Sequence, residues 1–316
     1  MPLLASRSAI AAALALTAVL TPTAVAAPES AGSAGRQAAA AAAANGRGRV
    51  VVVAAGDISD CAPPRCPAAR TARRVEAIDP TRVLTVGDNQ YERGAVREFV
   101  AEYDRTWGRF PRRTRPVPGN HEYLTADARG YFRYFGRRAH RRSNGYYSFD
   151  VGAWHVVALN SSNGCRSVRC GASSRQVNWL RRDLDRRAGR CVLAYWHHPP
   201  WSSGAHGGTP AVRPMWRVLA RNGGDVVVTG HDHDYERFAP RGADGSAAAR
   251  GMRQFVVGTG GAELRSFSSP HDRLSRKRIA HRNGVLRLAL GRRSFGFRFV
   301  TAAGRVLDRG GPIGCR

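Results

Sequence analysis

The chain has 316 residues and is strongly basic, with 50 Lys+Arg against 23 Asp+Glu and a formal net charge of +27. This length predicts one large domain or two small ones, with ample material for a hydrophobic core. A hydrophobic content of 43% excludes a disordered basic tail, and 35 Gly with 17 Pro in no fixed period exclude a collagen-like fibre. The charge leaves a nucleic-acid-binding or polyanion-binding function open.

The first 26 residues have the pattern of a secretory signal peptide. Arg7 lies in a short amino-terminal region, residues 9–20 form an uncharged apolar run, and residues 24–26 read Ala-Val-Ala, a small-x-small cleavage site. The apolar run is too short to span a membrane, and no comparable run follows it. Residues 27–48, rich in Ala and Gly, are expected to form a disordered linker, which leaves residues 49–316 as the folded domain. The sequence therefore predicts a secreted protein without a transmembrane segment.

Export would place the cysteines in an oxidising compartment, where their even number suits disulfides. The six are Cys61, Cys66, Cys165, Cys170, Cys191 and Cys315. Several pairings are possible. We prefer Cys61–Cys66 and Cys165–Cys170, which would each close a short loop, and this leaves Cys191 and Cys315 for each other. A thiolate metal site is the weaker alternative, because no Cys-x-x-Cys pair is present.

Apolar runs alternate with helical patterns in the first half of the domain. Residues 50–55 and 82–86 are continuous apolar runs that each end in Gly-Asp, which is typical of buried strands. Residues 70–78, between them, predict a helix. Residues 94–107 carry apolar side chains near helical spacing and predict a second helix.

The second half contains more predicted strands. Residues 146–151 and 154–160 predict adjacent strands around Gly152, and residues 173–187 predict an amphipathic helix capped by Ser173 or Ser174. A short helix is predicted at residues 215–221. Further strands are predicted at residues 191–196, 225–229, 254–257, 285–290 and 295–300, the last two as a hairpin.

Side chains of metal-binding type follow several of these strands. Asp57, Asp88, Asn120, His197, His231 and His233 each lie just after an apolar run or a short approach to a glycine. The first three are spaced by about one strand–helix unit each. Because the carboxyl ends of strands in open α/β sheets face one crevice, we expect these side chains to converge.

The ligand types restrict the metal. Aspartate, asparagine and imidazole without thiolate suit hard to borderline cations such as iron, manganese or zinc. These residues exceed what one tetrahedral zinc ion needs, so two ions that share an aspartate are the natural arrangement. Two such ions clamp a phosphate and lower the pKa of a bound water, which predicts a dimetal hydrolase.

Five sequence blocks occur in the order of the calcineurin-like metallophosphoesterases, which this chain resembles. They are Gly56-Asp57, Gly87-Asp88-Asn89-Gln90-Tyr91, Gly119-Asn120-His121-Glu122, Tyr195-Trp196-His197 and Gly230-His231-Asp232-His233. Residues 57–59 read Asp-Ile-Ser where most of that superfamily has Asp-x-His, and Tyr91 ends the second block. Both features resemble the purple acid phosphatases, most closely their small, mammalian-type members. The resemblance runs from about residue 50 to residue 307.

The resemblance implies an α/β fold, a four-layer sandwich of two mixed β-sheets flanked by helices, with residues 49–316 as the catalytic domain. It also implies two metal ions, Fe(III) and a divalent ion (Fe, Zn or Mn). The Fe(III) ligands would be Asp57, Tyr91 and His233. The divalent-ion ligands would be Asn120, His197 and His231, and Asp88 would bridge the two ions.

The resemblance assigns further roles beside the metals. His121 and His206 would contact the phosphate or protonate the leaving alkoxide, and Glu122 would orient a neighbouring histidine. Tyr91 would bind as tyrosinate, because a hard trivalent cation removes the phenol proton far below its usual pKa of about 10. The alternative is that Tyr91 is an ordinary wall residue and the metal pair contains no ferric ion. His206 could instead be simply exposed in its glycine-rich loop.

Other residues carry weaker signals. His198, next to a predicted ligand, could compete for the metal, and Trp201 could line the substrate cleft. The histidines expected not to bind metal are His140, His155, His271 and His281. Paired arginines, such as those at residues 292–293, are typical of solvated surfaces.

The sequence therefore predicts a secreted, monomeric dimetal acid phosphatase that hydrolyses phosphate monoesters by attack of a metal-bound hydroxide. Its substrates would be small phosphorylated molecules, and its basic surface would attract anionic polymers non-specifically. Two alternatives stay open. One is a phosphodiesterase or nucleotidase of the same superfamily, and the other is a non-catalytic polyanion-binding protein.

Overall fold

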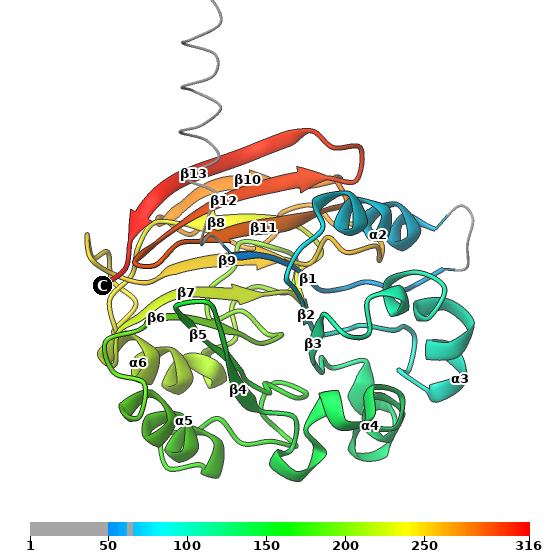
Figure 1. Cartoon of the computed structure of the whole chain (residues 1–316), viewed down its shortest axis with the longest axis horizontal. Helices are drawn as coiled ribbons and strands as arrows, with labels where there is room; N and C mark the ends of the chain where they lie inside the picture. The colour runs from blue at the N-terminus through cyan, green and yellow to red at the C-terminus, as the bar shows by residue number, and fades with distance from the viewer. Residues whose placement is uncertain (1–49, 62–65) are drawn as a thin grey trace, which may run out of the picture. The chain divides into compact units, whose positions relative to one another are not determined.

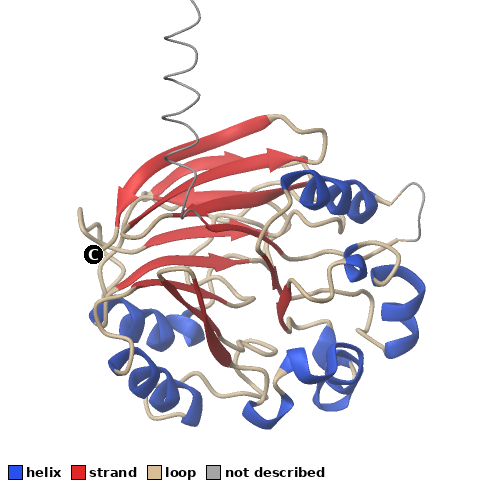
Figure 2. Ribbon diagram, viewed as in Figure 1, coloured by secondary structure: helices blue, strands red, loops and turns tan. Residues whose placement is uncertain are grey.

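Two mixed β-sheets form the centre of the protein, as a computed structural model of residues 50–61 and 66–316 shows (Figures 1 and 2). The predicted signal peptide (1–26) and linker (27–48) lie outside these described residues. The six-stranded sheet has the order β13 (Val306–Gly314), β12 (Ser294–Thr301), β11 (Gly284–Leu290), β1 (Val50–Ala55), β2 (Arg82–Val86), β3 (Thr114–Val117). In it, β1, β2 and β3 run parallel, and the other pairs are antiparallel.

The seven-stranded sheet contributes a second set of parallel strands. Its order is β10 (Ser275–Ile279), β8 (Tyr235–Phe238), β9 (Arg253–Val257), β7 (Gly224–Thr229), β6 (Cys191–Tyr195), β5 (Trp154–Ala158), β4 (Tyr147–Val151). Neighbours from β5 to β9 in this order pair in parallel, and the outer strands pair antiparallel. Each sheet therefore presents several strand carboxyl ends at one edge.

Helices cover the outer sides of the sheets. The α-helices are α2 (Pro67–Ile78), α3 (Val96–Glu98), α4 (Arg129–Phe135), α5 (Arg175–Asp185) and α6 (Arg213–Arg221). Figure 1 shows α5 and α6 beside the seven-stranded sheet and α2 beside the six-stranded sheet. Helix α5 begins where the side chain of Ser174 accepts a hydrogen bond from the Val177 amide, and α6 has a proline in its first turn, where a missing N–H costs nothing.

Strand β6 shows why the protein is layered. Leu193 and Tyr195 belong to the core that the two sheets share, whereas Val192 and Ala194 pack in the core beneath α5 and α6. Because side chains alternate between the faces of a strand, an entirely apolar strand needs cover on both sides. The predicted fold class, a sandwich of two mixed sheets flanked by helices, is confirmed.

The segment 94–107 is not one continuous helix. Helix α3 is only one turn, Phe99–Tyr103 forms a π-helical turn, and a separate 3₁₀ turn follows at Trp107–Arg109. The Tyr103 amide donates to the side-chain oxygen of Gln90 (3.1 Å), and the Asp104 amide donates to the Phe99 carbonyl five residues earlier. The Gln90 contact thus replaces the α-helical hydrogen bond that the apolar spacing alone predicts.

The structure pairs the cysteines as the sequence favours. The pairs are Cys61–Cys66, Cys165–Cys170 and Cys191–Cys315. The third joins β6 of the seven-stranded sheet to the residue after β13 of the six-stranded sheet. The next amide, that of Arg316, donates to Asp225 (2.7 Å), which begins strand β7 with Gly224. This end of the chain therefore fastens the two sheets together.

Over residues 50–61 and 66–316, every helix is too short or too polar to cross a lipid bilayer.

The long disulfide should contribute more stability than a short one. We expect C191A/C315A to lower the free energy of unfolding by about 5 kcal/mol and C165A/C170A by about 2 kcal/mol, because loop entropy grows with loop length. The two bridges span 124 and 5 residues. Urea unfolding followed by circular dichroism measures both variants against wild type. Equal losses would contradict the role given to the sheet-joining bridge.

Candidate metal centre

Loops that follow the parallel strands of both sheets meet at one place. Asp57 follows β1, Asp88 and Tyr91 follow β2, Asn120 follows β3, His197 follows β6, and His231 and His233 follow β7. Side chains separated by up to 176 positions therefore come within hydrogen-bonding distance, as the atoms below show. The structure thus brings these side chains together at the strand ends, as the sequence predicts.

The first group of donors surrounds the oxygen of Tyr91. This oxygen lies 3.2 Å from Oδ1 of Asp57, 3.3 Å from Oδ2 of Asp88 and 3.1 Å from Nε2 of His233. The His233 nitrogen is also 3.3 Å from Oδ1 of Asp57. All four side chains are buried. They are the three residues predicted to hold Fe(III), together with the predicted bridge.

The second group lies on the other side of Asp88. Its Oδ2 atom is 3.2 Å from Nε2 of His197, and that nitrogen is 3.1 Å from Oδ1 of Asn120. The ring of His231 is centred 5.1 Å from the ring of His197. Asn120 and His231 are partly exposed, so this group forms the mouth of the centre. A single oxygen of Asp88 thus faces both groups, so this carboxylate would be able to hold both metal ions.

Backbone carbonyls orient two of the imidazoles. The Val86 carbonyl is 2.9 Å from Nδ1 of His197, and the Glu263 carbonyl is 2.5 Å from Nδ1 of His233. Because a carbonyl only accepts, Nδ1 carries the proton in each ring and Nε2 is turned towards the centre. This arrangement leaves Nε2 available as a metal ligand.

Glu122 holds the ligand loops in place. Its carboxylate accepts hydrogen bonds from the amides of Asn89 (2.8 Å), Gln90 (3.2 Å) and Gly119 (2.6 Å). Its hydrogen bonds are thus to backbone amides of the second and third blocks, whereas the resemblance assigned it to a histidine. Burial and then the charge of Asp88 raise the pKa of Glu122 to about 7.

The backbone approaches the ligands too closely for most side chains. A Cβ on Gly119 would lie 2.1 Å from Oδ1 of Asp88, and one on Gly230 would lie 2.5 Å from Oδ2 of Asp57. Asp57, Asp88 and His231 themselves adopt φ values of 58°, 44° and 73°, in the left-handed region. Such strain costs free energy and clusters at functional sites.

The donor set fits cations. Within the described residues, the ion-pair partners of Asp57 and Asp88 are all histidines. Burial, and then the two carboxylates, raise the pKa of Tyr91 well above its usual value, so the metal-free phenol is neutral. Burial, and then neighbouring histidines, lower the pKa of His231 far below its usual range. Buried carboxylates beside imidazoles and a phenol form a site that two hard or borderline cations would satisfy.

His198 also lies at the centre. Its Nδ1 is 2.8 Å from the hydroxyl of Ser161, and its ring is centred 4.4 Å from that of His231. Ligand atoms of His197, His198 and His231 lie within 4.8 Å of one another. Burial, and then the positive charge of His197, lower the pKa of His198 to about 3, which leaves a neutral ring. His198 is therefore placed as a further donor at the mouth.

Both predicted catalytic histidines border the same mouth. His121 packs on the Tyr91 ring (centroids 4.1 Å apart), and its Nε2 is 4.0 Å from Oδ2 of Asp88. His206 is exposed, and its ring stacks on that of His231 at 4.6 Å. The structure thus brings His206 to the centre, although its loop is remote in sequence from the other blocks.

Two residues that support His206 were not identified from the sequence. Asp232 accepts a hydrogen bond from the His206 amide (2.6 Å) and another from the Ser202 hydroxyl. Arg265 donates a hydrogen bond to Nε2 of His206. The place of Asp232 between two ligand histidines was an available signal, whereas Arg265 lies in a polar stretch without a recognisable pattern.

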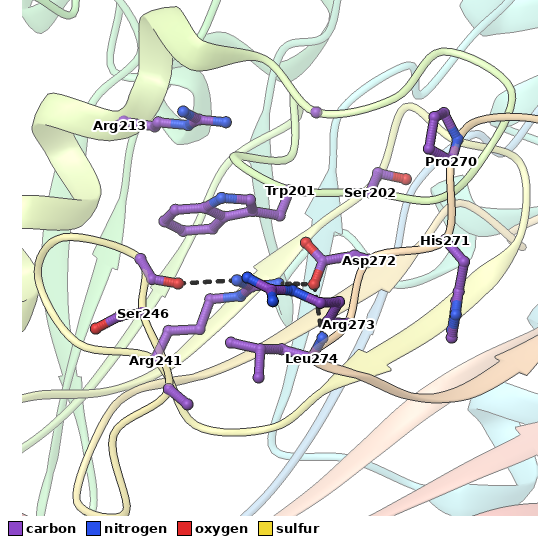
Figure 3. Close-up of a pocket in the computed structure, with 13 residues that line it drawn as sticks. Trp201, Ser202, Arg213, Arg241, Ser246, Pro270, His271, Asp272, Arg273 and Leu274 are labelled. Carbon is purple, nitrogen blue, oxygen red and sulfur yellow. Dashed lines mark hydrogen bonds and ion pairs between the residues drawn. The ribbon is translucent and has the colours of Figure 1, made fainter.

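Trp201 lines a pocket of about 760 Å³ together with Ser202 and Arg241 (Figure 3). The guanidinium groups of Arg213 and Arg241 lie 5.2 Å and 4.7 Å from its ring centre. Figure 3 shows them on opposite faces of the indole, so these faces are already occupied. Trp201 therefore packs between two arginines, which leaves neither face of its ring free for a ligand.

Three of the histidines that were expected not to bind metal contact residues outside the ligand groups. His155 is buried between Asp150 and Asp183, with each ring nitrogen 2.8 Å from a carboxylate oxygen. His140 stacks on Tyr147, and His281 contacts Ser266.

Comparison with known proteins places this geometry among the phosphoesterases. A family model described as "Calcineurin-like phosphoesterase" matches residues 35–235. Similar proteins include purple acid phosphatase 15 of Arabidopsis thaliana, 35% identical over 151 residues, which are 42% of this chain and 27% of that protein. Purple acid phosphatase 23 of the same plant is 29% identical over 198 residues, 51% of this chain and 42% of that protein. The matches thus span less than half the length of these relatives.

Solved structures share the fold at low sequence identity. A purple acid phosphatase, PPD1, from yellow lupin (Lupinus luteus) seeds has a TM-score of 0.67 and 18% identity, covering 83% of this chain and 53% of that chain. GAP50 of Plasmodium, described as the anchor in the inner membrane complex, has a TM-score of 0.61 and 12% identity, covering 85% and 89%.

The close approach at Gly119 gives a direct test of the centre. We expect G119A to lose bound metal, because its Cβ would displace the Asp88 carboxylate, with a stability cost of about 1–3 kcal/mol from overpacking. G171A is the matched control, since a Cβ there meets nothing within 4 Å. Elemental analysis of the purified proteins measures the metal content. Full metal loading in G119A would refute the placement of Asp88 as a ligand.

Proposed function

Since the chain belongs to the calcineurin-like phosphoesterase family, we propose that it hydrolyses phosphate monoesters at a centre of two metal ions. The observation that carries the proposal is the position of Oδ2 of Asp88, 3.3 Å from the Tyr91 oxygen and 3.2 Å from Nε2 of His197. Similarity to purple acid phosphatases over part of the chain supports the same activity.

The protein residues divide the work in this proposal. When bound, the two cations would activate water and neutralise charge on the phosphoryl oxygens. Asp57, Tyr91 and His233 would hold the buried ion, for which we propose Fe(III). Asn120, His197 and His231 would hold the divalent ion at the mouth, and Asp88 would belong to both sets.

The two histidines beside the mouth would act on the substrate. The ring of His206 stacks on that of His231 and receives a hydrogen bond from Arg265, which fixes its direction. His121 is held by its contact with the Glu92 carbonyl, 2.6 Å from Nδ1. We propose that they bind the phosphate and supply the proton that the leaving alkoxide needs.

Two features support a secreted enzyme. The first 26 residues have a signal-peptide pattern, and the three disulfides suit an oxidising compartment. We propose that the protein is exported and acts as a monomer on small phosphorylated molecules.

The fold alone does not decide between catalysis and binding. GAP50, of similar fold, is described as an anchor. The alternative is therefore a binding protein that keeps a metal site for structure, and a phosphodiesterase is the alternative within the same chemistry.

Substitution of the shared aspartate separates these functions. We expect wild type to hydrolyse p-nitrophenyl phosphate faster than bis(p-nitrophenyl) phosphate, and D88A to lose bound metal and about 10³-fold or more in kcat/KM. D185A removes an exposed aspartate of α5 and should match wild type. Steady-state assays with elemental analysis give both quantities. An active, metal-free D88A would falsify the proposal, and a preference for the diester would favour the phosphodiesterase.

The tyrosinate ligand has a visible signature. We expect the purified protein to be purple or pink and to contain iron, because a tyrosinate bound to Fe(III) absorbs visible light. Y91F should lose this absorption, whereas Y134F, which removes a hydroxyl bonded to Asp104, should keep it. Absorption spectra and iron analysis check both variants. A colourless zinc or manganese protein would contradict the ferric assignment.

A further inference from the structure

A second concave region of the surface, which we call the arginine cleft, is lined by five arginines. Its volume is about 860 Å³, and none of its lining residues among those described is acidic. The five are Arg70, Arg73 and Arg74 of α2, Arg282 of the loop before β11, and Arg305 of the turn between β12 and β13. Residues distant in sequence thus place their positive charges around one cavity.

Helix α2 is arranged so that its arginines point to the cleft. Arg70, Arg73 and Arg74 have the spacing of one helix face, while Ala68 and Ala72 are among the buried residues of the opposite side. The Arg74 guanidinium donates to the Ala302 carbonyl (3.4 Å). The helix and the β12–β13 turn are therefore in direct contact beside the cleft.

The cleft charges are not neutralised by the protein. The acidic residues near the end of α2 are used elsewhere, Glu76 with Arg109 (3.4 Å) and Asp79 with Arg113. Within residues 50–61 and 66–316, no ion pair joins a cleft arginine to a carboxylate. Like charges held together without counter-charges attract multivalent anions, with strong dependence on salt.

One short segment connects the cleft to the metal centre. The Glu263 carbonyl contacts His233, Arg265 contacts His206, and the Ser266 hydroxyl is 3.0 Å from Nε2 of His281, which lines the cleft. Residues 263–266 therefore contact both the metal centre and a residue that lines the cleft.

The side chains that line the arginine cleft suit a phosphate group better than the base of a nucleotide. Guanidinium groups match phosphate oxygens in geometry and charge. The cleft contains no Phe, Tyr or Trp among its described lining residues, whereas single-stranded nucleic acids are held largely by stacking on such rings. A ligand recognised through its phosphates alone fits this surface best.

We propose that the arginine cleft binds linear polyphosphate, with the terminal phosphate of the chain in the metal centre. This inference rests on the proposed function for its chemical step. Water adds its oxygen to the terminal phosphorus, the bridging P–O bond breaks, and orthophosphate and a shortened chain leave. The water protons pass to the products and solvent, so no further reactant is required.

Binding and turnover test the proposal with a matched pair of variants. R73Q/R305Q removes two cleft charges, and R292Q/R293Q removes two exposed charges at the opposite end of β11. Titration of the mature protein with labelled polyphosphate should show about tenfold weaker binding for R73Q/R305Q and a salt slope smaller by about two. R292Q/R293Q should stay within about twofold of wild type. The KM for polyphosphate should rise only in R73Q/R305Q, with p-nitrophenyl phosphate kinetics unchanged in both.

The outcomes separate this inference from the proposed function. If R73Q/R305Q and R292Q/R293Q weaken polyphosphate binding equally, the proposed cleft site is overturned, because the overall positive charge of the surface would then explain the binding. An oligonucleotide that binds as tightly, with the same dependence on the cleft arginines, would overturn it in favour of a nucleic-acid site. If the protein hydrolyses p-nitrophenyl phosphate but R73Q/R305Q binds polyphosphate as tightly as wild type does, the proposed binding site in the cleft is refuted and the proposed function stands. Cleft-dependent binding without hydrolysis of either substrate would refute the chemical step and the proposed function, and leave the binding site standing.

Discussion

The structure depends on the burial of two carboxylates, those of Asp57 and Asp88, which lie 3.2 Å and 3.3 Å from the phenol oxygen of Tyr91. Burial of like charges is costly unless cations or hydrogen bonds compensate it. The chain accepts further costs to keep them there, since both aspartates have left-handed backbones and Gly119 and Gly230 leave no room for a Cβ. Strained backbone of this kind clusters at functional sites, which agrees with two carboxylates that are positioned to receive cations.

Neither sheet could build this centre alone. The six-stranded sheet supplies the oxygen donors Asp57, Asp88, Tyr91 and Asn120, and the seven-stranded sheet supplies the imidazoles of His197, His231 and His233. The shared core and the Cys191–Cys315 bridge hold the two sheets in a fixed position relative to each other. Packing far from the centre therefore sets the distances between its ligands, because interiors as dense as protein cores transmit small displacements.

Sequence patterns predicted the parts of this arrangement that local physics determines. The buried strands β1, β2, β6 and β7 are continuous apolar runs, so they and the ligands after them could be identified. Two of the edge strands could not, because β10 reads Ser-Arg-Lys-Arg-Ile and β13 contains Gly-Gly-Pro, without an apolar face. Contacts such as Gln90 with Tyr103, Glu122 with the loop amides, and Arg265 with His206 join remote segments. No local pattern encodes such pairs.

The formal charge of +27 understates how positive the surface is. Several of the 23 acidic residues are buried, among them Asp57, Asp88, Glu122, Asp232, Asp234 and Glu236. Burial raises the pKa of Asp234 and of Glu236, which weakens their negative charge further. Most arginines within residues 50–61 and 66–316 are exposed or half-buried, so the buried acids do not neutralise them at the surface. Such a field accelerates the approach of any phosphate, whereas selection among phosphates must come from the placement of individual guanidinium groups.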